Sequence, residues 1–225
     1  MSRPGRPFAA VIFDLDGVLV DAEIWWDEVR IAFARRHGRR WTAEDRAAIM
    51  GANSHGWSSR MRERLHLDEL DREQIEREVV EAMVDRYRSA GAPRIPGAVE
   101  TVERVSRDHR VAVASSGHRD VIGAALGSLG IGSLFGAVVS SDEVAVGKPA
   151  PDVYLLTADR LGVEPGACLV VEDSLNGVLA GRAAGMIVAL VPNEAIPPAP
   201  GAREAASLVL DRIAELDPAA IAAGV

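Results

Sequence analysis

The chain contains five short apolar runs that each end in small or acidic residues: AAVIFD (9–14), RVAVASS (110–116), GAVVSSD (136–142), ACLVVED (167–173) and MIVALVP (186–192). Continuous Val, Ile, Leu and Ala of this kind are typical of strands that are buried on both faces of a parallel sheet. Helical patterns at 98–107, 152–162 and 174–185 separate most of these runs. Ser174 stands where an N-cap belongs, and Gly162 and Gly185 stand at helix ends. We therefore predict an open, mostly parallel, Rossmann-like α/β sheet flanked by helices.

Residues 21–92 interrupt this alternation. They contain helical, strongly charged stretches such as AEIWWDEVRIAFARRHG and ELDREQIEREVVEAMVDRYRSAG, with no convincing strand between them. We predict an all-helical cap domain at 21–92, inserted after the first strand of a core domain made of residues 1–20 and 93–225. We expect IPPAPGARE (196–204) to be a surface loop that leads to a short apolar run, SLVL, and a final helix.

Composition narrows the class of protein. The net charge of −8 argues against a nucleic-acid partner, and no apolar run approaches the ~20 residues of a membrane helix. The N-terminus lacks the features of a secretory signal, and Cys168, the only cysteine, lies in an apolar run that indicates a core position. We therefore expect a cytoplasmic protein without a membrane or nucleic-acid partner. The oligomeric state does not follow from the sequence.

Polar residues gather where the predicted strands end. They are Asp14 and Asp16, Ser115 and Ser116, Asp142 followed by Lys148, and Glu172 with Asp173. Ligands of open α/β sheets bind beyond the carboxyl ends of the strands, and closely spaced carboxylates are tolerable when a hard cation such as Mg²⁺ neutralises them. Any one of these residues alone is explained equally well as a turn or helix-cap residue. Their recurrence at four strand ends favours a shared site.

Lys148 stands out for a further reason. The 25 basic residues are 24 arginines and this one lysine. A compact ammonium fits a tight site in which the broad guanidinium of arginine does not. The sequence therefore predicts that Lys148 serves the chemistry of the site.

Four segments, FDLDGVLVD, VASSG, GKPAPDVY and VVEDSLNGVLAGRAAGM, resemble in order the four motifs of the haloacid dehalogenase-like hydrolases. The insertion after the first motif resembles the helical-cap subfamily, with the closest likeness to sugar-phosphate phosphatases and β-phosphoglucomutases. The resemblance implies that Asp14 attacks phosphorus to form an aspartyl-phosphate. It also implies that Asp16 moves protons to the leaving alcohol and from the attacking water, while its backbone carbonyl binds the metal.

The same resemblance assigns roles to the other motifs. Ser115 would donate a hydrogen bond to the phosphoryl group, with Ser116 as the alternative if the register differs, and Lys148 would place a positive charge beside the phosphoryl oxygens. Asp173, with Glu172 directly or through water, would complete a Mg²⁺ site together with Asp14 and Asp16.

Departures from the family pattern bear on the reaction. Haloacid dehalogenases proper lack an aspartate at the position of Asp16, and phosphonate-cleaving relatives use a cap lysine that is absent here. Mutase relatives carry a cap histidine about a dozen residues past the nucleophile, where this chain has Trp25 and Trp26, and an arginine in the loop that corresponds to MGANSHGWSSRM (50–61). Hydrolysis is therefore favoured over mutase chemistry. The mutase alternative stays open, because Arg60 could be a shifted equivalent of that arginine.

The loop at 50–61 also supplies the predicted substrate contacts. Asn53, His55, Trp57 and Arg60 combine hydrogen bonding, an apolar plate and a positive charge. The alternatives are that His55 is merely exposed and that Trp57 packs between cap helices. Adjacent helical residues diverge by ~100°, so only one of the two neighbouring tryptophans can face the site. His118 contacts substrate or caps the following helix, and capping is favoured.

We thus predict a Mg²⁺-dependent phosphatase that acts on a small phosphorylated metabolite resembling a sugar phosphate. β-Phosphoglucomutase-like phosphoryl transfer is the alternative reaction. A non-catalytic binding protein with the same fold is disfavoured, because every expected acid and the lone lysine are present.

Overall fold

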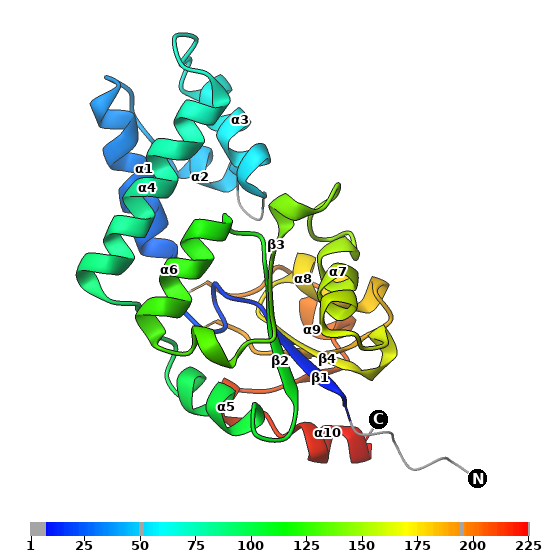
Figure 1. Ribbon diagram of the computed structural model, residues 1–225. Helices are drawn as coiled ribbons and strands as arrows, with labels where there is room; N and C mark the ends of the chain where they lie inside the picture. Colours follow the sequence, from blue (N-terminus) through cyan, green and yellow to red (C-terminus); the bar gives the residue numbers. More distant parts are fainter. Residues whose placement is uncertain (1–7, 50–51, 194–195, 225) are drawn as a thin grey trace.

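A computed structural model describes residues 8–49, 52–193 and 196–224. Its central layer is a six-stranded parallel sheet in the order β3-β2-β1-β4-β5-β6 (Figure 1). The strands are β1 Ala10–Phe13, β2 Arg110–Ser115, β3 Ala137–Ser140, β4 Cys168–Glu172, β5 Ile187–Leu190 and β6 Leu208–Val209. The first five are the five predicted strands, and the short β6 comes from the apolar run SLVL. The predicted parallel α/β sheet is confirmed.

Helices cover both faces of this sheet. Side chains alternate along β1, so that Val11 and Phe13 join one apolar cluster and Ala10 and Ile12 the other. The first cluster is shared with α5 (Ala98–Val105), α6 (Arg119–Leu129) and α10 (Pro218–Gly224). The second is shared with α7 (Asp152–Leu161), α8 (Leu175–Ala183) and α9 (Ala202–Ala205). Because strands of the central sheet are buried on both sides, they need the uninterrupted apolar sequences noted above.

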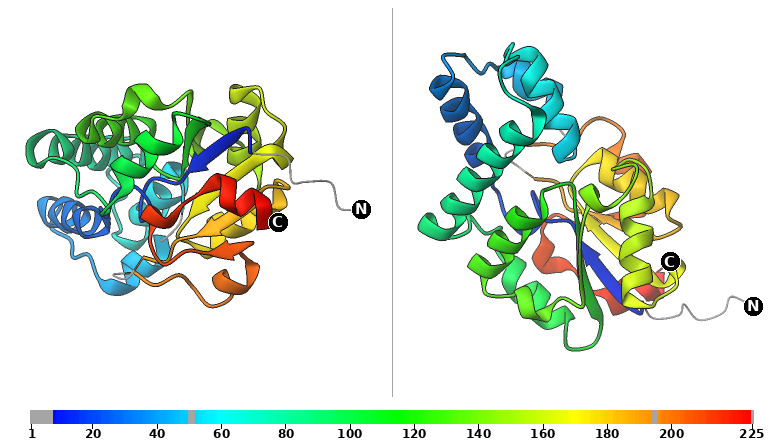
Figure 2. Two further views of the ribbon diagram at one scale, coloured as in Figure 1. Left: turned by 90° about the horizontal axis from the view of Figure 1, so that it is seen from below. Right: turned by 45° about the horizontal axis from the view of Figure 1, so that its top comes forward.

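Between β1 and α5 the described part of the chain forms helices and no strand. These helices are α1 Glu23–Arg36, α2 Ala43–Ile49, α3 Ser54–Arg64 and α4 Arg72–Ala90. Figure 2 shows them gathered together at one end of the molecule. Two chain segments connect them to the sheet, and these are hydrogen-bonded to each other through Asp21 N to Pro93 O at 2.7 Å and Ile95 N to Leu19 O at 3.0 Å. The arrangement agrees with a helical insertion, while its division into domains at 21–92 stays a prediction.

Several predicted caps have their expected geometry. Ser174 accepts a hydrogen bond from Gly177 N, and Gly162 ends α7 in the left-handed conformation. Gly185 has a positive φ one residue after the C-cap of α8. His118 is the N-cap of α6, where it accepts from Asp120 N, so the favoured interpretation of that residue is confirmed. None of the described helices is both long and apolar enough to cross a membrane.

Candidate active site

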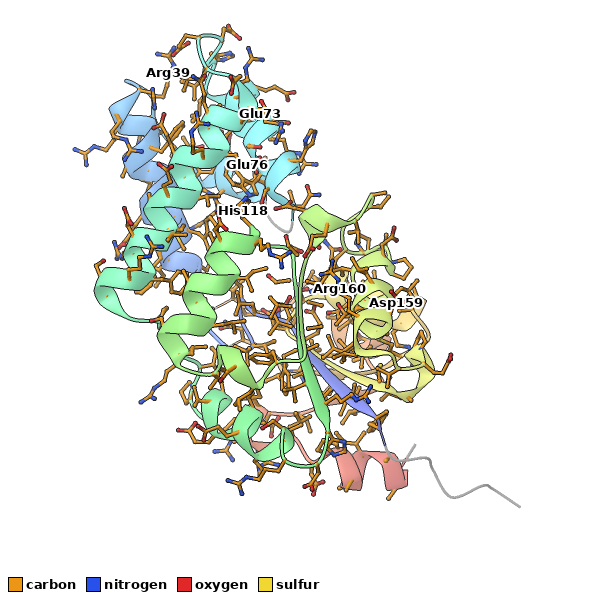
Figure 3. The ribbon with its side chains drawn as sticks, viewed as in Figure 1. Arg39, Glu73, Glu76, His118, Asp159 and Arg160 are labelled. Atoms are coloured by element: carbon orange, nitrogen blue, oxygen red, sulfur yellow. The ribbon has the colours of Figure 1, made fainter. Side chains whose placement is uncertain are left out.

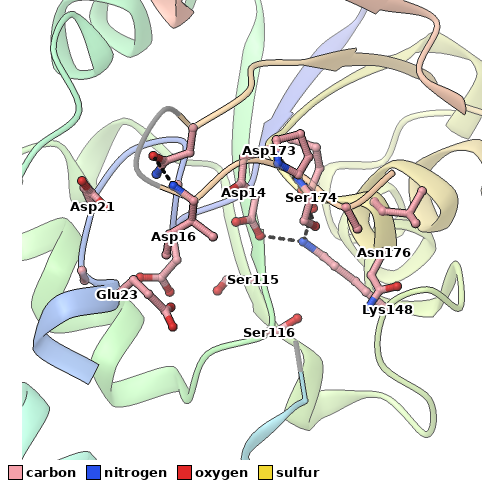
Figure 4. Close-up of a pocket in the computed structure, with 18 of the residues that line it drawn as sticks. Asp14, Asp16, Asp21, Glu23, Ser115, Ser116, Lys148, Asp173, Ser174 and Asn176 are labelled. Atoms are coloured by element: carbon pink, nitrogen blue, oxygen red, sulfur yellow. Dashed lines mark hydrogen bonds and ion pairs between the residues drawn. The ribbon is translucent and has the colours of Figure 1, made fainter. Parts of the chain in front are cut away.

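A cavity of about 290 Å³ lies at the carboxyl edge of the sheet (Figure 4). The residues of the first, second and fourth motifs line it together with Lys148 and with the loop after β5. They are Asp14, Asp16, Gly17, Asp21, Ala22, Glu23, Ser115, Ser116, Gly117, Lys148, Glu172, Asp173, Ser174, Leu175, Asn176, Asn193, Ile196, Pro197, Pro198 and Ala199. The structure thus brings Asp14, Asp16, Ser115, Ser116, Lys148, Glu172 and Asp173 together, as the sequence predicts.

Parallel register explains why these residues meet. Phe13 of β1 is opposite Val113 of β2 and Val171 of β4, so the residues that follow all emerge at one edge. Gly17 then turns the chain with a φ of +83°, and a Cβ there would lie 2.0 Å from the Asp173 carboxylate. Only glycine permits this close approach between the first and fourth motifs.

Lys148 sits at the centre of the site and is almost fully buried. Its Nζ donates to Asp14 Oδ1 at 2.6 Å, to Glu172 Oε1 at 2.7 Å and to the Ala114 carbonyl at 3.0 Å. These contacts engage all the donors of an ammonium group. Burial by itself lowers the pKa of Lys148, but the adjacent Asp14 and Glu172 carboxylates outweigh it and raise this pKa well above its ordinary value. Lys148 is therefore a fixed positive charge beside the Asp14 carboxylate.

Glu172 is buried and fully hydrogen-bonded. Its Oε1 accepts from Lys148 and from the Tyr154 hydroxyl, and its Oε2 accepts from Asp173 N, Ser174 N and Ser174 Oγ. Burial raises the pKa of Glu172, and the Lys148 charge with these hydrogen bonds outweighs it, so that the net shift is downward. With its oxygens already engaged, Glu172 is better placed to contact a metal through water than directly.

Burial destabilises the charged form of three aspartates of the site, Asp14, Asp16 and Asp173. Burial, opposed by Lys148 and aided by Glu172, raises the pKa of Asp14 to about 7. Burial, together with Glu23, raises the pKa of Asp16 to about 7 against the opposing effects of Arg30 and of a hydrogen bond from Trp26. Burial with the neighbouring Glu172 and Asp14 also raises the pKa of Asp173 well above its usual range.

This crowding of acids is what a bound cation relieves. Oxygens of Asp14, Glu172 and Asp173 lie within 4.8 Å of one another, which is a possible acidic metal site. An all-oxygen donor set with one face open to a cavity suits a hard divalent cation. The residues present therefore fit a metal of that class.

A second group of possible ligands lies away from the cavity, between α4 and the sheet-bearing part of the chain. It consists of Glu76, His118 and Asp142 (Figure 3 labels the first two). Its atoms already have partners, since Arg72 donates to Glu76 at 2.5 Å and Ser54 N donates to Asp142 at 3.0 Å. The cap bond at His118 Nδ1 leaves the proton on Nε2, which lies 3.9 Å from Glu76. This cluster links α3 and α4 to the sheet-bearing part and does not favour a cation.

The four residues predicted to contact substrate from the loop at 50–61 do not line this cavity. Trp57 is buried, with its ring 6.5 Å from that of Trp26, in agreement with the packing alternative. Asn53 is the N-cap of α3 and accepts from Gly56 N at 2.9 Å. His55 and Arg60 are exposed. Met50 and Gly51 of the same loop lie outside the described residues, and the substrate roles stay predictions.

One face of α1, to which the sequence analysis assigned no role, lies beside Asp16. Trp26 is the tryptophan that faces Asp16, while Trp25 packs edge-on against Tyr87 at 5.4 Å. Glu23, Trp26 and Arg30 share one face of α1, and the Arg30 guanidinium lies 4.8 Å from the Trp26 ring. Their spacing of three and four residues is a signal that the sequence offered for this face.

The loop after β5 adds a feature that the sequence did not indicate. Residues 196–200 form the predicted loop at the surface, with a short helix following at Ala202–Ala205. In addition, Ile196, Pro197, Pro198 and Ala199 form an apolar wall of the cavity. The prolines disfavour regular structure, but periodicity gives no information on where such a segment packs. The same cavity therefore has both an apolar part, at Ile196–Ala199, and an acidic part, at Asp21 and Glu23.

The fold and the site together define an α/β protein with a six-stranded parallel sheet and an acidic cavity at the carboxyl edge of that sheet. The model of the haloacid dehalogenase-like hydrolases matches residues 8–185, and the chain belongs to this family. The predicted family and the predicted class of enzyme are thereby confirmed.

Named relatives agree with a phosphatase. The chain is 34% identical over 199 residues to protein CbbY of Rhodobacter capsulatus, covering 82% of this chain and 86% of that protein. It is 32% identical over 179 residues to the fructose-1-phosphate phosphatase YqaB of Escherichia coli, covering 80% and 94%. The structure of CbbY from Rhodobacter sphaeroides in complex with phosphate superposes with a TM-score of 0.80 at 25% identity, covering 93% and 96%.

Proposed function

We propose that this protein is a Mg²⁺-dependent phosphatase that hydrolyses a small phosphorylated metabolite through an aspartyl-phosphate on Asp14. The observation that carries the proposal is the contact between Lys148 and Asp14 at 2.6 Å inside the acidic cavity. A buried ammonium that neutralises a carboxylate is what a nucleophile needs when a phosphate dianion approaches it. Lys148 engages Oδ1, and the second oxygen of Asp14 is then the one that attacks phosphorus.

Asp16 is suited to proton transfer. Its Oδ1 is buried without a hydrogen-bond partner, and its raised pKa of about 7 permits both gain and loss of a proton near neutrality. In the first step Asp16 donates its proton to the leaving alkoxide as the phosphorus–oxygen bond breaks. In the second step it takes a proton from the water that attacks phosphorus, the bond between Asp14 and phosphorus breaks, phosphate is released and the free Asp14 carboxylate is regenerated.

Ser115 and the metal complete the phosphoryl site. The Ser115 hydroxyl accepts from Gly117 N at 3.0 Å, which orients the oxygen and leaves its proton for a phosphoryl oxygen. Asp14 and Asp173, with the backbone carbonyl of Asp16 and with Glu172 through water, would hold Mg²⁺. The ion would supply positive charge for the phosphoryl oxygens when it is bound.

We further propose that helices α1 to α4 act as the cap predicted at 21–92 and close over the bound substrate. Contacts between α4 and α6, and between Ser54 and Asp142, support this placement. Closure would bring the predicted contact residues Asn53, His55 and Arg60 nearer to the leaving group.

The lining of the cavity favours a monophosphate as the substrate. Lys148 is the one cation among the described lining residues, whereas the acids Asp21 and Glu23 lie toward α1. Within this lining a second phosphate would meet acids and no further positive charge, which favours hydrolysis over mutase chemistry, a reaction that passes through a bisphosphate. Arg60 of the cap is the cation that closure would have to supply for a second phosphate. Sugar phosphates and related polyol phosphates fit, since the carboxylates of Asp21 and Glu23 can accept hydrogen bonds from their hydroxyl groups.

Hydrolysis of an aryl phosphate with Mg²⁺, with EDTA and with the variant Asp14→Asn tests the proposal. We expect turnover that requires both the metal and Asp14; activity that survives EDTA or the substitution contradicts the mechanism.

Incubation of β-glucose 1-phosphate with a trace of its bisphosphate distinguishes hydrolysis from mutase chemistry, because a mutase yields glucose 6-phosphate and a phosphatase yields free phosphate. A stable protein partner without turnover across a phosphate panel would instead support the binding-protein alternative.

A further inference from the structure

Tyr154 contacts the centre of the site from its protein side. It lies near the start of α7 and is completely buried. Its hydroxyl donates to Glu172 Oε1 at 2.7 Å, and its ring centroid is 4.9 Å from Lys148 Nζ. Tyr154 is absent from the described lining of the cavity. It therefore touches both members of the Lys148–Glu172 pair without touching the space for substrate.

The two contacts have opposite effects on Lys148. Glu172 Oε1 is shared between the Tyr154 hydroxyl and the ammonium, so the hydroxyl reduces the negative charge that this oxygen offers to Lys148. The aromatic face attracts the ammonium directly. The ring thus retains Lys148 in the site, while the hydroxyl weakens its bond to Glu172.

This balance matters because Lys148 has no spare donor. Its three N–H groups are engaged by Asp14, Glu172 and the Ala114 carbonyl. To bind a phosphoryl oxygen, the ammonium must loosen one of these bonds. A Glu172 that held Lys148 more strongly would draw it away from Asp14 and from the incoming phosphate.

We propose that Tyr154 is a positioning residue that keeps Lys148 available to the phosphoryl group by sharing Glu172 Oε1 and by presenting its ring face to the ammonium. The proposal rests on the proposed function in one respect, namely that Lys148 binds the phosphoryl group. Phenylalanine at this position keeps the ring and removes the shared hydrogen bond, and leucine removes both contacts.

The experiment compares Tyr154→Phe and Tyr154→Leu with the wild-type protein. Thr157→Val is the matched control, because Thr157 is a buried hydroxyl residue of the same helix that bonds only within it, to the Val153 carbonyl. Dissociation constants of inorganic phosphate in the presence of Mg²⁺, and of Mg²⁺ without phosphate, are measured by titration calorimetry. Values of kcat and KM for an aryl phosphate are measured in parallel.

We expect Tyr154→Phe to weaken phosphate binding about tenfold, as for loss of one hydrogen bond to a charged group, with Mg²⁺ binding within twofold of wild type. Tyr154→Leu should weaken phosphate binding further, and Thr157→Val should leave both constants within twofold. Equal phosphate affinity in Tyr154→Phe and wild type, or parallel losses of phosphate and Mg²⁺ affinity, overturns the inference. The two proposals can fail separately, because phosphate binding needs no turnover. A wild-type protein that binds phosphate but hydrolyses no substrate contradicts the proposed function. The phosphate affinities of the Tyr154 variants then still decide whether Tyr154 positions Lys148.

Discussion

Replacing Lys148 by methionine should reduce both the stability and the activity of the protein. The substitution keeps an unbranched side chain of similar length and removes the charge. It leaves Asp14 without the donor at 2.6 Å and takes one of two donors from Glu172 Oε1. The variant thereby separates the role of the ammonium from that of the space it occupies.

The magnitude follows from the burial of the three groups. The side chains of Lys148, Asp14 and Glu172 are 4%, 11% and 1% exposed. Removing one partner of a buried ion pair costs about 3–5 kcal/mol of unfolding free energy. Glu172 keeps its other donors and Asp14 can take up a proton, so we expect the lower end of this range, about 3 kcal/mol. Loss of a preorganised charge at the phosphoryl group should lower kcat/KM by about 10²–10³.

Urea unfolding at pH 7 in EDTA, followed by tryptophan fluorescence, measures the free energy of unfolding of each variant. Arg212→Met is the matched control, because it removes a cation from an ion pair with Glu215 in which the arginine side chain is 77% exposed, and such pairs contribute about 1 kcal/mol or less. A Lys148→Met variant that loses no more stability than Arg212→Met, or that retains more than a tenth of the wild-type kcat/KM, refutes the reasoning.

Three further outcomes follow from the structure. Gly177→Ala should lower the free energy of unfolding by about 2 kcal/mol or more in urea and should reduce activity, because a Cβ there would lie 1.7 Å from Glu172 Oε1. Gly166→Ala is the control, because a Cβ at Gly166 would have no atom within 4 Å among the neighbours described. Burial raises the pKa of Asp45, but hydrogen bonds from Thr42 and Arg64 outweigh it and lower this pKa, so the stability that the ionised carboxylate contributes is present above the unfolded pKa and is lost as pH falls through the folded pKa. Acid titration of stability should therefore show this loss in wild type and not in Asp45→Asn. Sugar bisphosphates should have kcat/KM at least about tenfold below matching monophosphates, since the acids at Asp21 and Glu23 repel a second phosphate; equal values in a substrate panel contradict the charge argument.

Much of the fold and of the phosphoryl site was predictable because local rules and the global fold agree. A strand such as Val11–Phe13 needs a continuous apolar sequence when both faces of the sheet are covered. Once the strands are parallel, the residues at their carboxyl ends meet without any further information. Asp14, Ser115 and Asp173 follow from this rule, and the lone lysine follows from composition.

The features of the site that could not be predicted depend on contacts between residues far apart in the sequence, which no local sequence pattern reveals. Tyr154 looks like an ordinary core residue of α7 until the structure places its hydroxyl on Glu172. Trp57 combines an apolar plate with a polar edge, and the choice between substrate and core is made by Trp26 on another helix. The residues Ile196–Ala199 line the cavity, and their sequence indicates a loop without indicating which part of the protein this loop contacts.

The cavity therefore consists of two parts with different origins. Under the proposed function, the strand ends and Lys148 form the phosphoryl part, in which Lys148 and Glu172 are held by buried hydrogen-bond partners. Asp21 and Glu23, around the start of α1, and the apolar wall at Ile196–Ala199 would form the part that receives the leaving group. Substitutions in the second part leave the hydrogen bonds of Lys148 and Glu172 intact, so they can alter which metabolite binds without altering phosphoryl transfer. Differences in substrate among proteins with this phosphoryl site should accordingly be sought first at the start of α1 and in the loop after β5.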